Sequence, residues 1–427
     1  MKKENAIIIG SSIAGLLAAR VCADHFDQVI ILEKDKISPE PAHRKGVPQD
    51  HQVHVLLSKG YEVIRQLFPG IIERLQDRGG ITGDLGLLLK WYSQGGYRPQ
   101  CETGLHTVMT SRPLLENTLR QMLLEKKQVS LIDQARITGL LHEGNTVVGV
   151  QTEEGKYYSN LLIDTRGIGS RLAPELEKMG YSAPEVEKVQ VNVTYTSCVF
   201  PRATDFYNVI NINSNPPHNS KSGTIQPIED GKMIVIVNGR SRDAAPKDLS
   251  SFKEYTQALD SPLVYQHIRD LEPVSGLFTY RIPYVRWIHF ERLSAFPEGI
   301  LPLGDAICRL NPVYGQGMSS AAIQAEILDK MLRKRETEPI WKPFFHEVAR
   351  EIKTPWELTV AEDFKFPETE GVPPKTPALL AKYFTKLNRV MNGEPVIYKA
   401  FARVLNMVSP PTVLFYPNIV WRVIKAR

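Results

Sequence analysis

The chain opens with an apolar run at residues 7–9 (III) that leads into a glycine-containing turn at 10–15 (GSSIAG) and a helix-forming segment. A second β-type run follows at 28–33, so this region predicts a strand, a helix and a strand. Such a βαβ unit directs unpaired backbone N–H groups and the positive end of the helix at one point. That arrangement suits a pyrophosphate, so the segment predicts an α/β nucleotide-binding fold.

The glycine pattern of this turn is GxSxxG. Gly10 permits the tight turn, Gly15 lets helix and strand approach closely, and Ser12 and Ala14 are small. Glu33 closes the second strand 23 residues after Gly10, near the spacing of about 20 at which an acid binds ribose hydroxyls. A carboxylate there would repel a 2′-phosphate, so a nucleotide of the FAD or NAD type is expected. The alternative is a turn in an ordinary α/β protein, with Glu33 at a solvated strand end.

A second pattern joins an apolar run to small residues, at 299–306 (GILPLGDA) and 311–322 (NPVYGQGMSSAA). The first segment is expected to deliver Asp305 to the end of a strand, where a carboxylate can bond a polyol such as ribitol. Gly315 and Gly317 precede a predicted helix that starts with small residues, so backbone can approach a flat ring. The positive end of that helix would stabilise negative charge on a reduced flavin. The alternative is a loop and helix start packed for stability.

Composition excludes several other classes of protein. At 427 residues and 48.2 kDa, 42% hydrophobic and 23% charged, the chain is expected to form two domains rather than a disordered or fibrous structure. The net charge is +5 and no Lys/Arg run is long enough to follow a phosphate backbone, so no nucleic acid partner is expected. Four scattered cysteines without a CxxC pair indicate a reducing, cytoplasmic location and argue against disulfides.

Three further features bear on location and metal binding. Lys2, Lys3 and the apolar stretch after them resemble a secretory signal, but residues 24–27 (DHFD) end that stretch, and a strand, helix and strand explain it better. No run of about 18 apolar residues occurs, so no transmembrane helix is expected. His51 and His54 lack an accompanying carboxylate or cysteine set, so no metal is expected.

The two patterns together resemble the flavin-dependent monooxygenases of the aromatic hydroxylase type. Residues 164–171 (DTRGIGSR) stand where that family has a DG motif and depart from it by two inserted residues. Segments 46–57 (GVPQDHQVHVLL), 111–116 (SRPLLE) and 355–358 (PWEL) look like the epoxidase branch, which includes squalene epoxidase and bacterial polyene epoxidases of polyether biosynthesis. Flavin halogenases share the nucleotide-binding fold, but their WxWxIP motif has no match in this sequence. The most similar segment is 286–289 (RWIH).

The predicted fold class is α/β: a Rossmann-like FAD-binding domain, a β-rich substrate domain and a helical C-terminal portion. Within it we expect antiparallel hairpins at 139–163, a strand at 232–237, helices at 249–259 and 317–335, and an extended connector at 367–377. The expected boundaries are 1–80, 105–175 and 286–340 for the FAD-binding domain, 81–104 for an insertion that belongs to the substrate domain, 176–285 for the β-rich substrate domain, and 341–427 for the C-terminal region.

The resemblance implies which residues would hold FAD. The ADP part would lie against the opening turn with Lys34 beside the adenine, and Arg112 and Arg120 compete for one role because the helix register is open. The implied cofactor contacts are Gly10, Ser12, Ala14, Gly15, Glu33, Lys34, Arg44, Gln49, His54, Arg112, Arg120, Asp305, Gly315, Gly317 and Met318. Aromatic residues of the β-rich stretch are candidates for the substrate site, with core packing as the alternative. They are Tyr195, Phe200, Phe206, Phe278 and Tyr280.

The resemblance also implies an activity: an FAD-dependent monooxygenase that inserts one oxygen atom from O₂ through a flavin C4a-hydroperoxide. The expected reaction is epoxidation or hydroxylation of a lipophilic polyene, prenylated or polyketide compound. NAD(P)H would donate electrons directly or through a separate flavin reductase, and no side chain is expected to serve as an essential acid or base. Two alternatives stay open: an FAD-dependent reductase of isoprenoid double bonds, like geranylgeranyl reductases, and a non-catalytic prenyl-binding protein on a flavoprotein fold.

The last 33 residues, 395–427, contain no Asp or Glu but five Lys or Arg among many aromatic and aliphatic residues. That composition suits contact with an anionic membrane surface, which would place the protein at the inner face of a membrane. The alternative is a C-terminal helix packed on the core.

Overall fold

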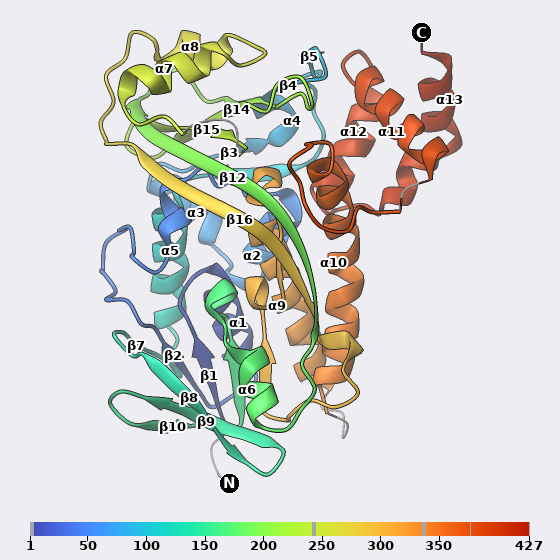
Figure 1. Ribbon diagram of the computed structural model, residues 1–427. Helices are drawn as coiled ribbons and strands as arrows, with labels where there is room; N and C mark the ends of the chain where they lie inside the picture. The colour runs from blue at the N-terminus through green and yellow to red at the C-terminus, as the bar shows by residue number, and fades with distance from the viewer. Residues whose placement is uncertain (1–3, 241–244, 335–338, 376, 427) are drawn as a thin grey trace.

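The protein is described by a computed structural model over residues 4–240, 245–334, 339–375 and 377–426. A five-stranded parallel sheet with the order β17–β11–β1–β2–β7 lies in the lower half of Figure 1. Its strands are β1 (Asn5–Ile9), β2 (Gln28–Leu32), β7 (Val129–Ile132), β11 (Leu161–Asp164) and β17 (Ile300–Pro302). Residues 6–9 of the central strand β1 are all buried, as expected of a parallel strand covered on both faces.

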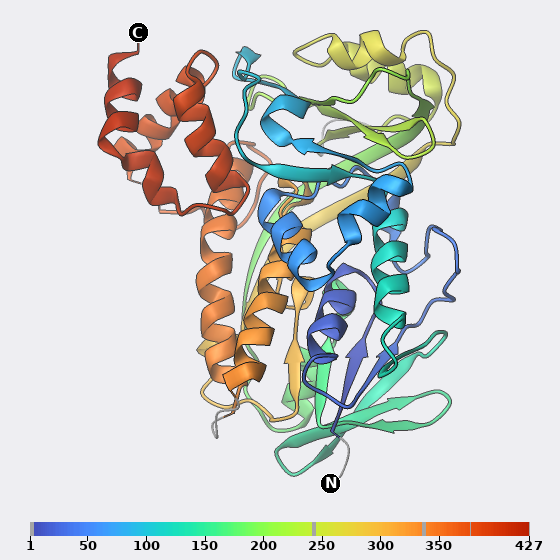
Figure 2. The ribbon, with the colours of Figure 1, turned by 180° about the vertical axis from the view of Figure 1, so that it is seen from behind.

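Helices from distant parts of the chain pack beside this sheet (Figure 2). α1 contacts α5 and α9, and α9 also contacts α2 and α10. These helices are α1 (Ile13–Cys22), α2 (Ser58–Leu67), α5 (Arg112–Leu124), α9 (Gly317–Lys334) and α10 (Trp341–Asp363), with the shorter α3 (Ile71–Asp77) and α6 (Leu172–Lys178) nearby. The predicted helix at 317–335 is therefore confirmed as α9 within the described residues.

A small antiparallel sheet follows β7, as the hairpin pattern predicts. Its strands are β8 (Ile137–Glu143), β9 (Thr146–Thr152) and β10 (Lys156–Tyr158). The chain then enters the parallel sheet at β11. A separate two-stranded sheet joins β3 (Ile81–Asp84) to β6 (His106–Met109).

The upper half of the molecule is an eight-stranded sheet with the order β18–β16–β12–β15–β14–β13–β4–β5. Its strands are β4 (Leu89–Ser93), β5 (Gly96–Tyr97), β12 (Glu185–Pro201), β13 (Val209–Ile212), β14 (Ser222–Ile228), β15 (Lys232–Gly239), β16 (Phe278–His289) and β18 (Cys308–Arg309). α7 (Leu249–Gln257) and α8 (Leu263–Ile268) cover one face, and α4 (Leu85–Leu88) precedes β4. β16 runs without a break past residue 285, so the boundary expected there falls inside a strand.

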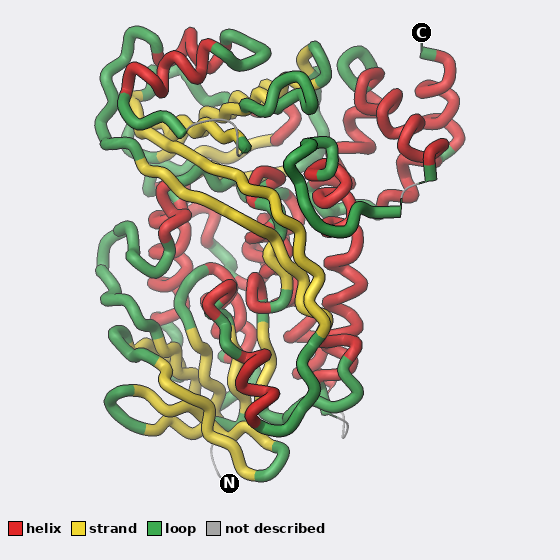
Figure 3. Tube along the Cα trace, viewed as in Figure 1, coloured by secondary structure: helices red, strands yellow, loops and turns green. Residues whose placement is uncertain are grey.

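The C-terminal region is helical and lies beside the large sheet (Figure 3). After α10 and a connector without regular structure come α11 (Ala378–Val390), α12 (Pro395–Leu405) and α13 (Pro417–Lys425). Tyr398 and Ala402 of α12 pack against Leu85 and Leu105, which joins this region to the β-rich part. Across the described ranges, every helix is too short or too polar to cross a membrane.

Candidate functional site

The turn between β1 and α1 depends on two glycines. Gly10 has a φ of 101°, and its N–H donates to the Leu32 carbonyl at 2.8 Å. A Cβ on Gly15 would lie 1.9 Å from the Gly10 carbonyl oxygen, so only glycine fits. Ser12 is the N-cap of α1, yet its hydroxyl makes no capping bond. The first N–H groups of α1 are therefore left for an external acceptor at the positive helix end.

Glu33 points back toward this turn from the end of β2. One carboxylate oxygen accepts hydrogen bonds from the Ser11 N–H at 2.8 Å and the Ser11 hydroxyl at 2.9 Å. Arg44 Nη1 donates to the same oxygen at 3.0 Å. Burial by itself would raise the pKa of Glu33, but Arg44 and the hydrogen bonds lower it below its ordinary value. The carboxylate is therefore ionised, as an acceptor for ribose hydroxyls should be.

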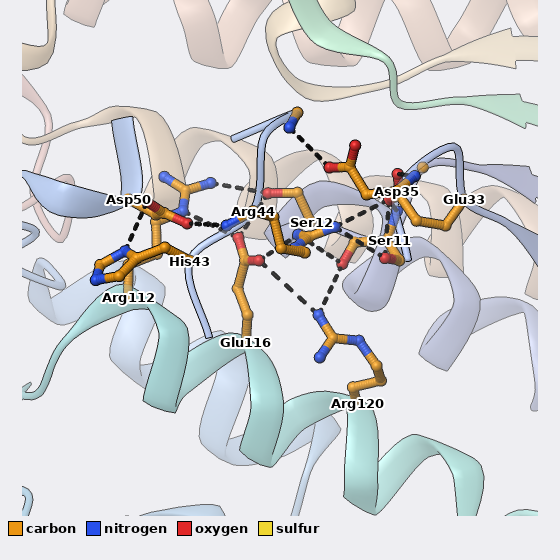
Figure 4. A network of polar contacts seen from close by, with 12 residues as sticks. Ser11, Ser12, Glu33, Asp35, His43, Arg44, Asp50, Arg112, Glu116 and Arg120 are labelled. Carbon is orange, nitrogen blue, oxygen red and sulfur yellow. Dashed lines mark hydrogen bonds and ion pairs between the residues drawn. The ribbon is translucent and has the colours of Figure 1, made fainter. Parts of the chain in front are cut away.

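Glu116 of α5 joins the turn to three arginines (Figure 4). Its carboxylate accepts from the Ser12 hydroxyl at 2.6 Å, from Arg112 Nε at 2.9 Å and from Arg44 Nη2 at 2.5 Å. Arg120 lies 4.0 Å away. Although burial would raise it, Arg112 and Arg44 lower the pKa of Glu116 to about 2. Glu116 is not among the predicted site residues, although its spacing of four from both helix arginines places all three on one helix face.

The charges beside the start of α1 favour an anion. In the cluster joined through Glu33 and Glu116, three guanidinium groups outnumber these two carboxylates. The buried Nε of Arg120 has no hydrogen-bond partner in the described part of the chain. A diphosphate offers several acceptor oxygens to guanidinium and backbone N–H donors. The cluster therefore fits the diphosphate of a nucleotide.

His54 supports Arg112 from the loop before α2. Its Nδ1 donates to the Gln52 carbonyl at 2.8 Å, so its Nε2 accepts from Arg112 Nη1 at 3.0 Å. Burial, and next the charge of Arg112, lowers the pKa of His54 to about 3. His54 is therefore neutral near neutral pH and acts as a positioning residue for Arg112.

The second sequence pattern reaches the same place from β17. A Cβ on Gly304 would lie 2.9 Å from the Ala14 side chain in α1, and the Gly304 N–H donates to Gln324 of α9 at 2.7 Å. This approach brings Asp305, in the 3₁₀ turn η4 (Gly304–Ala306), to the start of α1. The half-buried Asp305 carboxylate has no hydrogen bond or ion pair with any described residue, and burial raises its pKa. It is free to accept hydrogen bonds from a ligand.

The loop before α9 completes the site. The 3₁₀ turn η5 (Pro312–Tyr314) leads into Gly315, whose φ is 70°. α9 begins at Gly317, where a Cβ would meet no atom within 4 Å, and the next residue, Met318, is buried. The open space over Gly317 lets a flat ring lie against the backbone.

A cavity of about 1390 Å³ lies beside this loop. Its walls are the loop, one face of the large sheet, and parts of α10, α11 and α12. Tyr195 of β12 lines it, and the Tyr195 hydroxyl donates to Asn311 Oδ1 at 3.5 Å. The volume exceeds the usual range of about 300–1,000 Å³ for small-molecule sites, so the cavity has room for a large substrate.

Two of the aromatic residues expected at the substrate site lie in the core instead. Phe200 is fully buried against Phe252 of α7, and Phe206 packs against His267 of α8. Phe200 faces the helices that cover the opposite face of the sheet, because side chains alternate along a strand. Phe206 lies in the loop between β12 and β13 and packs against the same helices. Neither lines the cavity.

The Phe278 ring stacks against His51, which in turn stacks against His43. The His51 ring lies 3.8 Å from Phe278, and the His43 ring lies 3.6 Å from His51 at an angle of 16°. His43, Asp50 and His51 bring ligand atoms within 4.8 Å of one another. His43 Nδ1 lies 2.8 Å from Asp50 Oδ1, and His51 Nε2 lies 3.7 Å from the same oxygen. His54, which the sequence spacing groups with His51, lies at Arg112 instead.

The remaining predicted residues have different surroundings. The Tyr280 hydroxyl accepts from Arg309 at 2.8 Å, outside the residues that line the cavity. Lys34 is exposed after β2, and Gln49 is half-buried in the 3₁₀ turn η1 (Pro48–His51). Roles for these residues stay predictions.

Asp164 closes β11 beside the site. It is fully buried and accepts from Arg166 Nε at 2.9 Å and from the Ser170 hydroxyl at 2.7 Å. These bonds satisfy the carboxylate within its own segment. One partner of the aspartate is therefore Arg166, an inserted residue of the DG-like motif, and the other is Ser170, which follows the glycines of the motif.

Comparisons with known proteins agree with this geometry. No protein-family model matches the chain. The chain is similar to Protein Rv3254 of Mycobacterium tuberculosis, with 27% identity over 364 residues (78% of this chain, 74% of that protein). It is also similar to the FAD-dependent monooxygenase spyC of Aspergillus fumigatus, with 25% identity over 354 residues (77% and 70%). The structure of the flavin-dependent brominase Bmp2 matches with a TM-score of 0.70 at 16% identity, covering 98% of both chains.

The chain has the fold of the flavin-dependent monooxygenases. The predicted fold class is thereby confirmed, including the parallel sheet, the β-rich sheet and the C-terminal helices. The solved structures share too little sequence to show more than the fold. The epoxidase branch and the residue roles stay predictions.

Proposed function

We propose that the protein is an FAD-dependent monooxygenase that inserts one oxygen atom from O₂ into a lipophilic substrate. The contact of Gly304 with Ala14 carries this proposal, because it joins two patterns 290 positions apart in the sequence. That contact puts an unpartnered carboxylate and a helix start at the nucleotide-binding turn. The name of the relative spyC, an FAD-dependent monooxygenase, supports the same chemistry.

The residues present fit FAD. The start of α1 would hold the diphosphate with Arg44 and Arg112, and Glu33 would bind the ribose. Asp305 would accept hydrogen bonds from the ribityl chain, and the backbone at Gly317 would lie against the ring. Reduced FAD, when bound, supplies the activation of O₂.

The chain itself would bind and orient the cofactor and the substrate, and it would exclude water from them. Glu116 and His54 hold Arg112 in one position, so the diphosphate site is organised before the cofactor arrives. The cavity walls would limit the access of solvent to the reacting atoms. Burial raises the pKa of Tyr195, so its hydroxyl keeps its proton and would orient a substrate rather than exchange a proton with it.

We further propose that the reaction is epoxidation, or else hydroxylation, of a polyene, prenylated or polyketide compound. The cavity is large, and part of its wall is aromatic and aliphatic, which supports a substrate of that class. NAD(P)H is the proposed electron donor, either directly or through a separate flavin reductase.

Labelled oxygen tests this function. The FAD-loaded protein is incubated with a reductant, ¹⁸O-labelled O₂ and a panel of polyenes and prenylated aromatics, and product mass is measured. The expected product gains one labelled oxygen atom. A reductase of isoprenoid double bonds would add hydrogen without consuming O₂, and a non-catalytic prenyl-binding protein would stay colourless with added FAD.

We also propose that α13 contacts an anionic membrane surface. Trp421 and Ile424 are 58% and 68% exposed, and Lys425 lies over the Trp421 ring at 4.5 Å. Their spacing places all three on one helix face. Phe415 and Tyr416 add exposed aromatic surface just before the helix. Basic and aromatic side chains together favour the interface of anionic lipids.

Co-sedimentation with phosphatidylglycerol vesicles tests this contact. The double variant Trp421→Ser, Ile424→Ser should bind several-fold less, whereas Val274→Ser, an equally exposed position in the β-rich part, should bind like the parent. Unchanged binding of the double variant would contradict the proposal. So would equal binding to uncharged phosphatidylcholine vesicles.

A further inference from the structure

The face of the large sheet that lines the cavity carries several polar side chains beside apolar ones such as Ile236. Along β15, Val235 and Val237 enter the core beneath α7, whereas Asn238 lines the cavity. The neighbouring strands bring Asn211 and Thr224 to the same cavity. A sheet face that only packs against protein is apolar. The polar side chains therefore indicate a surface that meets a ligand.

These side chains form cross-strand pairs. Asn211 of β13 lies opposite Thr224 of β14. Asn238 lies between Ser222 on one side and Tyr195 on the other. Directly opposite residues project from the same face of a sheet, so hydrogen-bonding groups run across four neighbouring strands.

Two amide groups at this face keep free donors. The Ser222 hydroxyl donates to Asn238 Oδ1 at 2.6 Å, and Asn211 Nδ2 donates to Asn213 Oδ1 at 2.9 Å. The amide NH₂ groups of Asn213 and Asn238 have no acceptor among the described residues. Both side chains are half-buried and line the cavity, so their NH₂ groups are available to a ligand held there.

The opposite wall includes an apolar part, to which α11 and α12 contribute Phe384, Phe401 and Leu405. Trp91 of β4 lies on the sheet face beside Asn211. The ring of Trp91 lies 6.4 Å from that of Phe401, so the two walls meet there. A molecule between them would meet hydrogen-bond donors on one side and apolar surface on the other.

The polar face ends at the loop before α9. Tyr195, the neighbour of Asn238, donates to Asn311, and Asn311 directly precedes η5. Arg240 follows Asn238 by two residues and is ion-paired with Asp363 at 2.6 Å, so its charge is compensated. Arg240 therefore presents no unpaired charge to a molecule held along this face.

We propose that Asn213 and Asn238 select an uncharged substrate with carbonyl, ether or hydroxyl oxygens along one edge and hydrocarbon along the other. This inference rests on the proposed monooxygenase function of the same cavity and narrows its substrate class. A site built to hydrogen-bond such oxygens rejects an analogue without them, because its donors would be left unpaired. A pure hydrocarbon is therefore a poor substrate.

Matched pairs of ligands test the assignment on the FAD-loaded protein. Each pair shares a carbon skeleton and differs in its oxygens: farnesylacetone against the hydrocarbon with CH₂ in place of the carbonyl, and menadione against 2-methylnaphthalene. Affinity is read from the quenching of tryptophan fluorescence, to which Trp91 in the wall contributes. The oxygenated member of each pair should bind about 10-fold more tightly.

Asn213→Leu and Asn238→Leu remove the donor at similar side-chain size, so each should reduce this preference to about threefold or less. Thr138→Val in β8, outside the cavity, is the control and should leave it unchanged. Asn213→Ala and Asn238→Ala, which also lack a side-chain donor, replace any leucine variant that does not fold.

Three results would overturn the assignment: equal affinity within the pairs, no binding of the oxygenated members, or a preference that survives both substitutions. Oxygen uptake and flavin absorbance are measured on the same preparations. Equal affinity within the pairs in a parent protein that is yellow and consumes O₂ would count against the amide donors alone. A colourless, inactive protein would count against the proposed function.

Discussion

The Ser12 hydroxyl donates a 2.6 Å hydrogen bond to Glu116, which lies 104 positions later in the chain. Ser12 occupies the middle position of GxSxxG, where a glycine would have no side-chain donor. The bond ties the start of α1 to α5 and, through the same carboxylate, to Arg44 and Arg112. The serine thus has a structural partner of its own and is more than a tolerated replacement for glycine.

Glu116→Gln should destabilise the protein by about 3 kcal/mol, because it leaves buried arginines without their counter-charge. Urea unfolding measures the loss. Glu125→Gln is the matched control, since its pair with Arg74 lies on the surface and should be worth less than about 1 kcal/mol. Equal losses in the two variants would show that the Glu116 cluster does not act as a buried unit.

Gly15→Ala should lower the bound flavin by about 10-fold or more, since its Cβ would collide with the Gly10 carbonyl and open the turn. Flavin released per mole of purified protein is the measurement. Gly139→Ala in β8 introduces a Cβ that meets no atom within 4 Å, so its flavin content should match the parent. A yellow Gly15→Ala protein would place the cofactor elsewhere.

Asp305→Asn should act in opposite directions on stability and on FAD binding. Without FAD, removing a half-buried charge that has no partner should leave the unfolding free energy equal or slightly higher. The dissociation constant for FAD should rise about 10-fold or more, because hydrogen bonds to a charged group are worth about 1.5–3 kcal/mol. Fluorescence titration of the FAD-free protein measures that constant, and an unchanged value would remove Asp305 from the site.

His54 should make stability depend on pH in the mildly acidic range. The unfolded chain binds a proton at the ordinary histidine pKa of 6.5, but the folded chain does so only near 3. The contribution of neutral His54 to the free energy of unfolding is therefore complete above about pH 6.5 and falls as the pH falls. The loss is about 1.5 kcal/mol between about pH 6.5 and about pH 5.

His54→Asn keeps a donor for the Gln52 carbonyl and should remove that part of the pH dependence. Urea unfolding at the two pH values gives the comparison. His51, whose pKa is also lowered by burial, remains in both proteins and accounts for a residual slope. An identical slope in the variant would mean that His54 is protonated in the folded state.

Short-range patterns predicted the elements that build the site, but not the partners of its side chains. The helix expected at 249–259 is α7 (Leu249–Gln257), and hydrophobic periodicity was sufficient for it. Glu116 was missed as a site residue because its partners come from the first turn and from the loop that carries Arg44. Only folding brings these segments together.

The nucleotide-binding turn could be read from the chain because its steric demands are local: no other residue fits at Gly15, whatever surrounds the sheet. The residues that line the cavity could not be predicted from the sequence in this way. Tyr195 and Phe200 stand five positions apart on β12, so they point to opposite faces, one into the cavity and one into the core. Which face holds a ligand depended on where α7, α8 and the C-terminal helices docked, and those are contacts between residues far apart in the sequence.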